Sequence, residues 1–231
     1  MKIKGFLESS MVDWEGRISA VIFISGCNFS CPFCHNADLV KENSALPEIP
    51  REQIISTLRK KRNWLDGVVI TGGEPCMFPD LIGLIKELRE IGYPIKLDTN
   101  GSYPQLLGEL LANKLVDYVA MDVKAPLNDI YQKITASSIN TETIRQSIGL
   151  ILSLAPAYEF RTTFVPSFLN KEAIMEIAAV LEGSRKYCIQ QFNPKNAMDP
   201  LLRDIKPYNS GYLRETLEVC QKLIPNAKLR D

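Results

Sequence analysis

The sequence predicts an α/β fold, a partial (open) parallel barrel of six β/α units, and two observations support this expectation. Short apolar runs recur along the chain and are typical of buried strands. The stretches between them repeat leucine and isoleucine at helical spacing, which is typical of amphipathic helices. Because apolar strands that alternate with helices form parallel sheets covered by helices, right-handed crossovers would curl the six units into an open barrel.

Each expected element follows from a local pattern. The apolar runs predict strands at Ile18–Ile24, Gly67–Ile70, Pro94–Leu97, Asp117–Met121, Glu159–Val165 and Tyr187–Phe192. Helical repeats begin at Leu81, Leu106, Ile144, Ile174 and Leu213. With 231 residues and 45% apolar types, the chain can build one sizeable core, so we expect one domain over residues 1–231.

Composition excludes several classes of function. Lysine plus arginine and aspartate plus glutamate both number 27, so we expect neither nucleic acid nor a membrane as partner. Polar residues interrupt the uncharged stretch 18–37 well short of a membrane span. Six cysteines behind an N-terminus without a signal-peptide pattern indicate the reducing cytoplasm. We expect Cys76, Cys188 and Cys220 to be buried, inert thiols.

The other three cysteines form the most informative motif of the chain. Cys27, Cys31 and Cys34 follow the first expected strand, with three and then two residues between them. Soft thiolates at this spacing suit zinc or an iron–sulfur cluster. Three of them would leave one iron of a four-iron cluster without a protein ligand, and an open iron can bind a substrate or cofactor.

Two rival readings of this motif start from the same residues. Residues 31–35 read Cys-Pro-Phe-Cys-His, the pattern by which c-type haem is attached, but haem attachment needs an exported chain. A structural zinc site needs a fourth ligand, which Cys76 could supply. A zinc-binding interaction module without chemistry is therefore the non-enzyme alternative.

Polar residues follow four of the expected strands directly. They are residues 25–34, Thr71 to Pro75, Asp98 to Gly101, and Asp122 to Lys124. Carboxyl ends of parallel strands meet at one edge, where barrels bind their ligands. Arg161 in the fifth strand, and Gln191 with Asn193 at the end of the sixth, could reach the same mouth. Any one of these patterns alone would fit a plain turn or ion pair, so their combination beside the cysteines is what indicates a site.

The cysteine motif, followed by Gly72-Gly73-Glu74-Pro75, resembles the radical S-adenosylmethionine (SAM) superfamily over essentially the whole chain. Within it the chain is similar to the activating enzymes of glycyl radical enzymes. That similarity rests on Gly5-Phe6, Asp13, Gly16, Arg17, Cys34-His35-Asn36, Asp98-Thr99-Asn100-Gly101 and Asp122-x-Lys124. The lineage it resembles most is that of anaerobic ribonucleoside-triphosphate reductase activating proteins, without the ferredoxin-like insert of some related activases.

The resemblance implies one 4Fe-4S cluster on Cys27, Cys31 and Cys34, with SAM on its open iron. The implied cofactor-binding residues are Phe33, Gly72, Gly73, Glu74, Asp98, Thr99, Asn100, Asp122, Lys124 and Arg161. Phe33 would lie near the adenine, the Gly72–Glu74 backbone near the methionyl amine, and Lys124 and Arg161 near the carboxylate. Asp98 and Asp122 would help to place the cofactor, with a monovalent cation beside Thr99 as a further candidate.

The resemblance also implies the reaction. Reductive cleavage of SAM would give methionine and a 5′-deoxyadenosyl radical, which takes a hydrogen atom from a glycine of a partner enzyme. We expect anaerobic ribonucleotide reductase as that partner, and flavodoxin or ferredoxin as electron donor. The alternatives are activation of pyruvate formate-lyase or another glycyl radical enzyme, and a small-molecule enzyme such as 7-carboxy-7-deazaguanine synthase.

Some residues carry weaker expectations. His35, the only histidine, could order the cysteine loop, contact the adenine through its backbone, or lie on the surface, and we favour the backbone contact. Phe23 and Phe29 are expected in the core or at a partner contact. The apolar residues Met11, Val12 and Trp14 are candidates for the partner surface, with a role in covering the barrel floor as the alternative.

Overall fold

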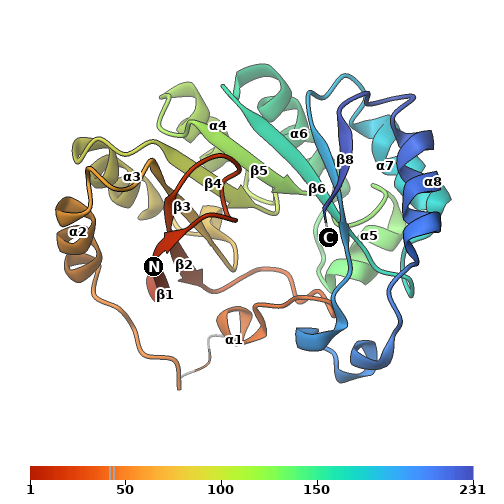
Figure 1. Cartoon of the computed structure of the whole chain (residues 1–231), viewed down its shortest axis with the longest axis horizontal. Helices are drawn as coiled ribbons and strands as arrows, with labels where there is room; N and C mark the ends of the chain where they lie inside the picture. Colours follow the sequence, from red (N-terminus) through yellow and green to blue (C-terminus); the bar gives the residue numbers. More distant parts are fainter. Residues whose placement is uncertain (42, 44, 231) are drawn as a thin grey trace.

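The computed structural model describes residues 1–41, 43 and 45–230 and shows a curved sheet with helices on its outside (Figure 1). Within these residues the sheet has eight strands in sequence order. The first pair is antiparallel and every later pair is parallel. No pairing joins the first described strand to the last, so the sheet stays open between its two edges. The expected open α/β barrel is confirmed.

The strands are β1 (Lys2–Ser10), β2 (Ser19–Ser25), β3 (Gly67–Gly72), β4 (Ile95–Thr99), β5 (Tyr118–Asp122), β6 (Tyr158–Phe164), β7 (Tyr187–Gln191) and β8 (Ala227–Arg230). The six expected strands correspond to β2 through β7, with ends shifted by at most two residues. The expectation of only six strands is wrong because it misses both edges. β1 has few inward apolar residues and two irregularities in its pairing, and β8 is only four residues long. Edge strands of this kind lack the continuous apolar run that identifies a buried strand.

The helices are α1 (Ala37–Val40), α2 (Arg51–Lys60), α3 (Leu81–Glu90), α4 (Pro104–Ala112), α5 (Asp129–Thr135), α6 (Thr141–Leu154), α7 (Lys171–Val180) and α8 (Ser210–Cys220). Short 3₁₀ turns η1 (Pro75–Met77), η2 (Pro194–Asn196) and η3 (Pro200–Asp204) lie in loops. The last four helices begin after an asparagine whose side chain accepts a backbone N–H, which sets where each starts. Within the described residues, no helix combines the length and the apolar character needed to cross a membrane.

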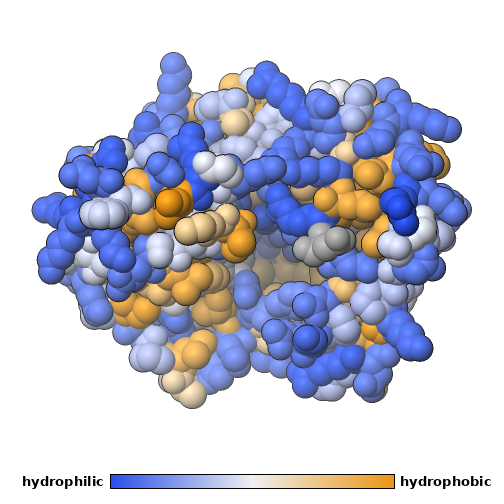
Figure 2. All heavy atoms as spheres, in the orientation of Figure 1, coloured by the Kyte–Doolittle hydropathy of each residue, from blue (hydrophilic) through white to orange (hydrophobic). Residues whose placement is uncertain are grey.

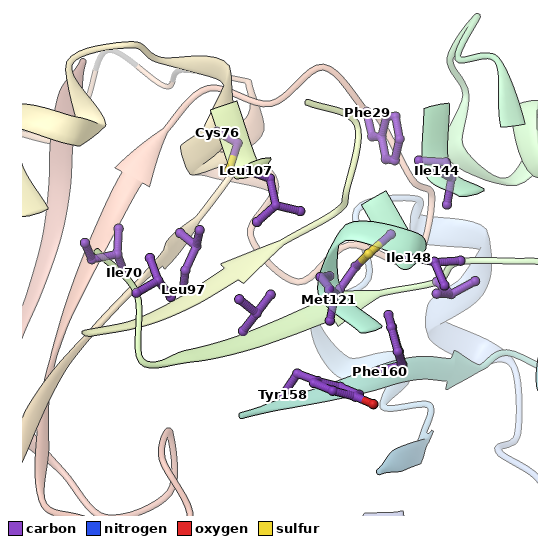
Figure 3. Close-up of a cluster of buried hydrophobic side chains, with 14 of the residues drawn as sticks. Phe29, Ile70, Cys76, Leu97, Leu107, Met121, Ile144, Ile148, Tyr158 and Phe160 are labelled. Atoms are coloured by element: carbon purple, nitrogen blue, oxygen red, sulfur yellow. The ribbon is translucent and has the colours of Figure 1, made fainter. Parts of the chain in front are cut away.

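The outer face of the sheet forms the main core. Alternate strand residues such as Ile70, Leu97 and Met121 point away from the barrel axis and pack beneath the helices. Figure 3 shows them in one layer with Leu107 of α4 and Ile148 of α6. Because successive strand residues face opposite sides, the residues between them must point into the barrel. Side chains of the inner face therefore either plug the barrel or form a site.

The end of the barrel opposite the carboxyl ends of the parallel strands is plugged by the loop of residues 11–18 that joins β1 to β2. This loop is hereafter the mouth loop, because it also borders the open side of the sheet. Trp14 is 5% exposed and packs on Val21 and Val69, with its ring 6.0 Å from that of Tyr118. Trp14 thus covers the barrel floor, and its expected place on the partner surface is wrong. Met11 and Val12, by contrast, are 76% and 87% exposed.

The mouth loop also reaches the opposite edge of the sheet. Glu15 accepts hydrogen bonds from Lys186, just before β7, and from Lys228 in β8. These hydrogen bonds and the positive charge hold the pKa of Glu15 down, at about 2. The carboxylate is largely exposed, so water and salt screen the pair. The contact still fixes the loop across the opening, at the amino ends of the parallel strands. Figure 2 shows a recess on this open side of the sheet.

We expect Trp14→Ala to lower the free energy of unfolding by about 3–5 kcal/mol, because it removes the largest side chain of the barrel floor and leaves a cavity. Urea denaturation measures the change. Trp64→Ala is the matched control, since Trp64 is 79% exposed and its loss should change stability by less than about 0.5 kcal/mol. Equal stability of the two variants would contradict the placement of Trp14.

Candidate functional site

The loop after β2, residues 26–36, carries the three-cysteine motif and is hereafter the cysteine loop. The backbone leaves β2 through Gly26, whose φ of 98° is open to glycine but costly for other residues. The Cys34 N–H then donates to the Cys31 carbonyl oxygen and closes a turn between these two cysteines. The turn brings both thiols toward one side of the loop.

Contacts from four directions hold the cysteine loop in place. Asn36 Nδ2 donates to the carbonyl oxygen of Gly72 at the end of β3. Gly26 N–H donates to the carbonyl oxygen of Leu39, and Ser30 N–H donates to the carbonyl oxygen of Thr135 in α5. From the segment after β7, Asp199 N–H donates to the Pro32 carbonyl oxygen (2.8 Å). Figure 1 shows this segment beside the cysteine loop at the lower edge of the sheet.

His35 adds a further contact between the cysteine loop and the segment after β7. Its Nε2 lies 2.7 Å from the backbone oxygen of Asn193, and its ring is otherwise exposed. The structure thus gives His35 the first of its three expected roles, ordering the loop by a side-chain hydrogen bond. The favoured backbone contact with an adenine stays a prediction.

A cavity of about 440 Å³ opens above the inner face of the sheet. Cys27, Cys31 and Cys34 all line it, and the ends of β3, β4 and β5 form its floor. All of the implied cluster ligands and cofactor-binding residues except Glu74 line the same cavity, whereas Gln191 and Asn193 do not. Within the described residues, no three His, Cys, Asp or Glu side chains converge closely enough to hold a single metal ion.

The thiols differ in their surroundings. Burial raises the pKa of Cys27 to about 12 and that of Cys31 to about 11. Lys124 acts in the opposite direction on both and favours their thiolates. Cys27 Sγ accepts the Phe29 N–H (3.4 Å) and lies 3.8 Å from Asn100 Nδ2. Such donors stabilise a sulfur that carries negative charge, as metal-bound thiolates do.

The backbone of the Gly-Gly-Glu-Pro segment packs directly against the backbone at the end of β2 and the start of the cysteine loop. Gly73 N–H donates to the Ile24 carbonyl oxygen and Glu74 N–H donates to that of Gly26. A Cβ atom on Gly73 would lie 1.9 Å from the Gly26 oxygen, so no larger residue fits there. Gly72 has a φ of 121° and is equally crowded. The two glycines thereby let β3 end directly beside the cysteine loop.

Glu74 is fully buried under this segment and does not reach the cavity with its side chain. Its carboxylate accepts hydrogen bonds from the backbone of Cys76 and Asn100 and from the Thr99 hydroxyl. Burial raises the pKa of Glu74 to about 7, although these hydrogen bonds act to lower it. The side chain therefore fixes the loop after β4 to the loop after β3. Only its backbone remains a candidate for cofactor contact.

Five charged side chains inside the barrel form one connected chain of ion pairs, hereafter the ion chain. Its central member is Arg161, with Nε 2.8 Å from Asp122 Oδ1 and Nη1 3.2 Å from Asp98 Oδ2. Lys124 Nζ lies 3.0 Å from Asp122 Oδ2, and Lys96 Nζ lies 3.1 Å from Asp98 Oδ1. Three cations face two carboxylates, so these five side chains together carry one positive charge in excess.

The ion chain sets the protonation of its members. Burial acts to raise the pKa of Asp122, but Arg161 and Lys124 outweigh it and hold that pKa well below its usual range. Burial likewise acts to lower the pKa of Lys124 and Arg161, and the neighbouring carboxylates raise both well above their ordinary values. All three groups are therefore charged near neutral pH. Two of the cations, Lys124 and Arg161, line the cavity, and their charged N–H donors suit a ligand with a carboxylate.

Asp98 Oδ1 is a buried acceptor without a directed hydrogen bond from the described residues, despite the nearby Lys96 ammonium. The Asp98 residue lines the cavity, so a hydroxyl, ammonium or small cation bound there would lie next to this carboxylate. Thr99 Oγ1, in contrast, donates to Glu74 at 2.7 Å. Asn100 donates to Asn28 and accepts from Ser102, and so joins the cysteine loop to β4. The phenyl ring of Phe33 is 5.9 Å from the Lys124 ammonium.

The structure also brings residues to the cavity that the sequence left aside. Gln190 lines it, whereas Gln191 Nε2 donates to the Tyr208 carbonyl oxygen on the other side of β7. The expectation that Gln191 faces the mouth is therefore wrong. Successive side chains of a strand point to opposite faces, and it is the preceding residue, Gln190, that faces the cavity. Phe23 of β2 and Thr163 of β6 also line the cavity. Alternate residues of a strand face the same side of the sheet, so counting in steps of two along β2 and β6 could have identified both residues.

With this geometry in place, comparisons with known proteins are informative. The profile of the Radical SAM superfamily matches residues 21–182. A Methanocaldococcus jannaschii protein named "Putative glycyl-radical enzyme activating enzyme" is 35% identical over 99% of this chain and 95% of its own length. The pyruvate formate-lyase-activating enzyme of Clostridium pasteurianum is 26% identical over 94% of this chain and 98% of its own.

Among solved structures, Streptococcus suis SuiB bound to S-adenosylmethionine aligns with a TM-score of 0.69 at 15% identity. The alignment covers 91% of this chain and 52% of SuiB, so this chain spans about half of that protein. At this identity the likeness concerns the fold alone.

The chain belongs to the radical SAM superfamily, whose members use a 4Fe-4S cluster and SAM. Within that class it is a glycyl-radical enzyme activating enzyme, an oxidoreductase of the radical SAM type. Three thiols and two cationic side chains, Lys124 and Arg161, lie on one cavity and fit this pair of cofactors.

Proposed function

We propose that this protein holds a 4Fe-4S cluster on Cys27, Cys31 and Cys34, binds SAM in the adjoining cavity, and generates a glycyl radical on anaerobic ribonucleotide reductase. The observation that carries the proposal is that the three thiols line the same cavity as all members of the ion chain except Lys96. A cluster held by three cysteines keeps one iron for SAM. A site for the cluster alone would not need charged donors such as Lys124 and Arg161 beside it.

The protein's own contribution is binding, orientation and exclusion of water. When bound and reduced, the cluster supplies the electron that cleaves SAM to methionine and a 5′-deoxyadenosyl radical. Lys124 and Arg161 would neutralise the methionyl carboxylate, and the backbone beside Gly72 and Gly73 would accept the methionyl ammonium at close range. Phe33 would shield the adenine from water. Because none of these groups has to move a proton, the catalysis is positional.

The remaining contacts would complete the placement of SAM. Asp98, which lines the cavity, would bind a hydroxyl or the ammonium of SAM, or a monovalent cation. Asp122 would act by holding Lys124 and Arg161 charged and in position. Thr99 and Asn100 would support the site through Glu74 and the cysteine loop.

The substrate atom of this reaction is a hydrogen on the α-carbon of a glycine in the partner. The cavity lies on the open side of the sheet, so a loop of another protein can reach it. Met11 and Val12 lie exposed on the mouth loop and offer apolar surface to that partner. Electrons would come from a one-electron carrier such as flavodoxin or ferredoxin.

Three sequence features support the reductase as partner. The N-terminal segment up to Arg17 resembles the reductase activases, no ferredoxin-like insert with further Cys-x-x-Cys motifs is present, and His35 is the only histidine. Pyruvate formate-lyase is the second candidate, since its activating enzyme from Clostridium pasteurianum aligns over nearly the whole chain.

We expect Cys31→Ala protein to lose most of its iron and sulfide and all SAM cleavage, because the cluster would keep only two thiolate ligands. Iron and sulfide analysis of anaerobically purified protein measures this. Cys220→Ala is the control, since Cys220 is the buried last residue of α8 and lies far along the chain from the cysteine loop. A brown, iron-loaded and active Cys31→Ala protein would overturn the ligand assignment.

The partner assignment predicts the outcome of a direct comparison. Reduced protein with SAM should place a stable radical on a C-terminal glycine of anaerobic ribonucleotide reductase and should do so poorly on pyruvate formate-lyase. Electron paramagnetic resonance detects the radical on either partner. A strong signal on the lyase with none on the reductase would leave the enzyme class in place and reverse the choice of partner.

A further inference from the structure

Lys96 is a buried lysine that the proposed mechanism does not use. It lies in β4, two residues before Asp98, and points into the barrel with 4% of the residue exposed. Its Nζ donates to the carbonyl oxygen of Asp13 (2.5 Å) and lies 3.1 Å from Asp98 Oδ1. The ammonium also faces the ring of Tyr118 at 5.9 Å. One side chain thus touches both the mouth loop and the ion chain.

The mouth loop is buried on one side of this contact and exposed on the other. Trp14 anchors it in the barrel floor, and Asp13 lines the cavity. Met11 and Val12, directly before Asp13, extend into solvent. A partner that displaces these two exposed side chains would therefore also displace the neighbouring carbonyl group of Asp13, which Lys96 binds.

On the other side, Lys96 shares Asp98 with Arg161. Asp98 is bonded by Arg161 through Oδ2 and approached by Lys96 at Oδ1. A buried ammonium has to keep its acceptors, since each lost contact leaves charge without solvation. A shift of the Asp13 carbonyl would thus move Lys96 relative to Asp98. That movement would change how Asp98 and Arg161, which both line the cavity, hold each other.

We propose that Lys96 is a positioning residue that couples the mouth loop to the cofactor cavity through Asp98. The inference rests on the proposed function, because docking of a partner on Met11 and Val12 is the event that the coupling would transmit. Coupling between two sites is reciprocal, so SAM in the cavity must in turn restrain the mouth loop. That second direction can be measured without any partner.

The test is hydrogen–deuterium exchange of the mouth loop in iron-loaded protein, with and without SAM. In the wild-type protein SAM should slow exchange of the amides of residues 12–17. In Lys96→Met protein SAM should bind about tenfold more weakly, as expected when one charge-assisted contact is lost. At saturating SAM, the protection of the mouth loop should be absent from this variant.

Two further variants separate coupling from folding. Lys96→Arg keeps the charge and should restore most of the SAM-dependent protection. Lys86→Met, on the exposed face of α3, is the matched control and should behave as wild type. A merely structural role of Lys96 would lower the melting temperature and leave the SAM-dependent protection unchanged. Should Lys96→Met fail to fold, Lys96→Gln removes the charge with a smaller change of polarity and is expected to lose the same protection.

Wild-type protection of the mouth loop in a folded, iron-loaded, SAM-saturated Lys96→Met or Lys96→Gln protein would overturn the inference. This outcome is distinct from failure of the proposed partner, because the exchange experiment contains only the protein and SAM. Absence of a radical on the reductase would contradict the partner assignment and leave the exchange result as it stands.

Discussion

Burial of the ion chain inside the open barrel is the constraint on which the rest of the structure depends. An isolated charge in such a place costs several kcal/mol, so each carboxylate and each cation must meet its partner. The partners come from neighbouring strands, and the register that places Asp122 beside Arg161 is the register of β5 with β6. Asp98 on β4 joins the same cluster. A slip of one residue in any of these pairings would expose charge to the apolar outer core.

The cysteine loop depends on the same strands for its rigidity. Asn36 binds the end of β3, and Asn100 at the end of β4 reaches both Cys27 and Asn28. Glu74 in turn ties these two strand ends together beneath the loop. The cysteines are therefore oriented by the sheet before any cofactor binds. Preorganisation of this kind lowers the cost of holding a cluster and SAM in one geometry.

Much of this arrangement could be predicted from the sequence. Apolar runs located β2 to β7 within two residues, and the polar residues at their ends identified the edge that carries the cavity. The edge strands β1 and β8 were missed because neither has a continuous apolar run. Long-range contacts also lay beyond prediction: nothing in the spacing of Trp14 shows that it enters the barrel floor. The pairing of Lys96 with Asp13 is likewise a product of the folded topology.

The central claim is that the ion chain positions SAM on the three-cysteine site, and titration of SAM into iron-loaded Arg161→Lys protein tests it most directly. Lysine keeps the charge but cannot contact Asp122 and Asp98 together as the guanidinium does. The account predicts an unchanged iron content and SAM binding weakened by about tenfold or more. Wild-type affinity for SAM in a variant with a full complement of iron would contradict it.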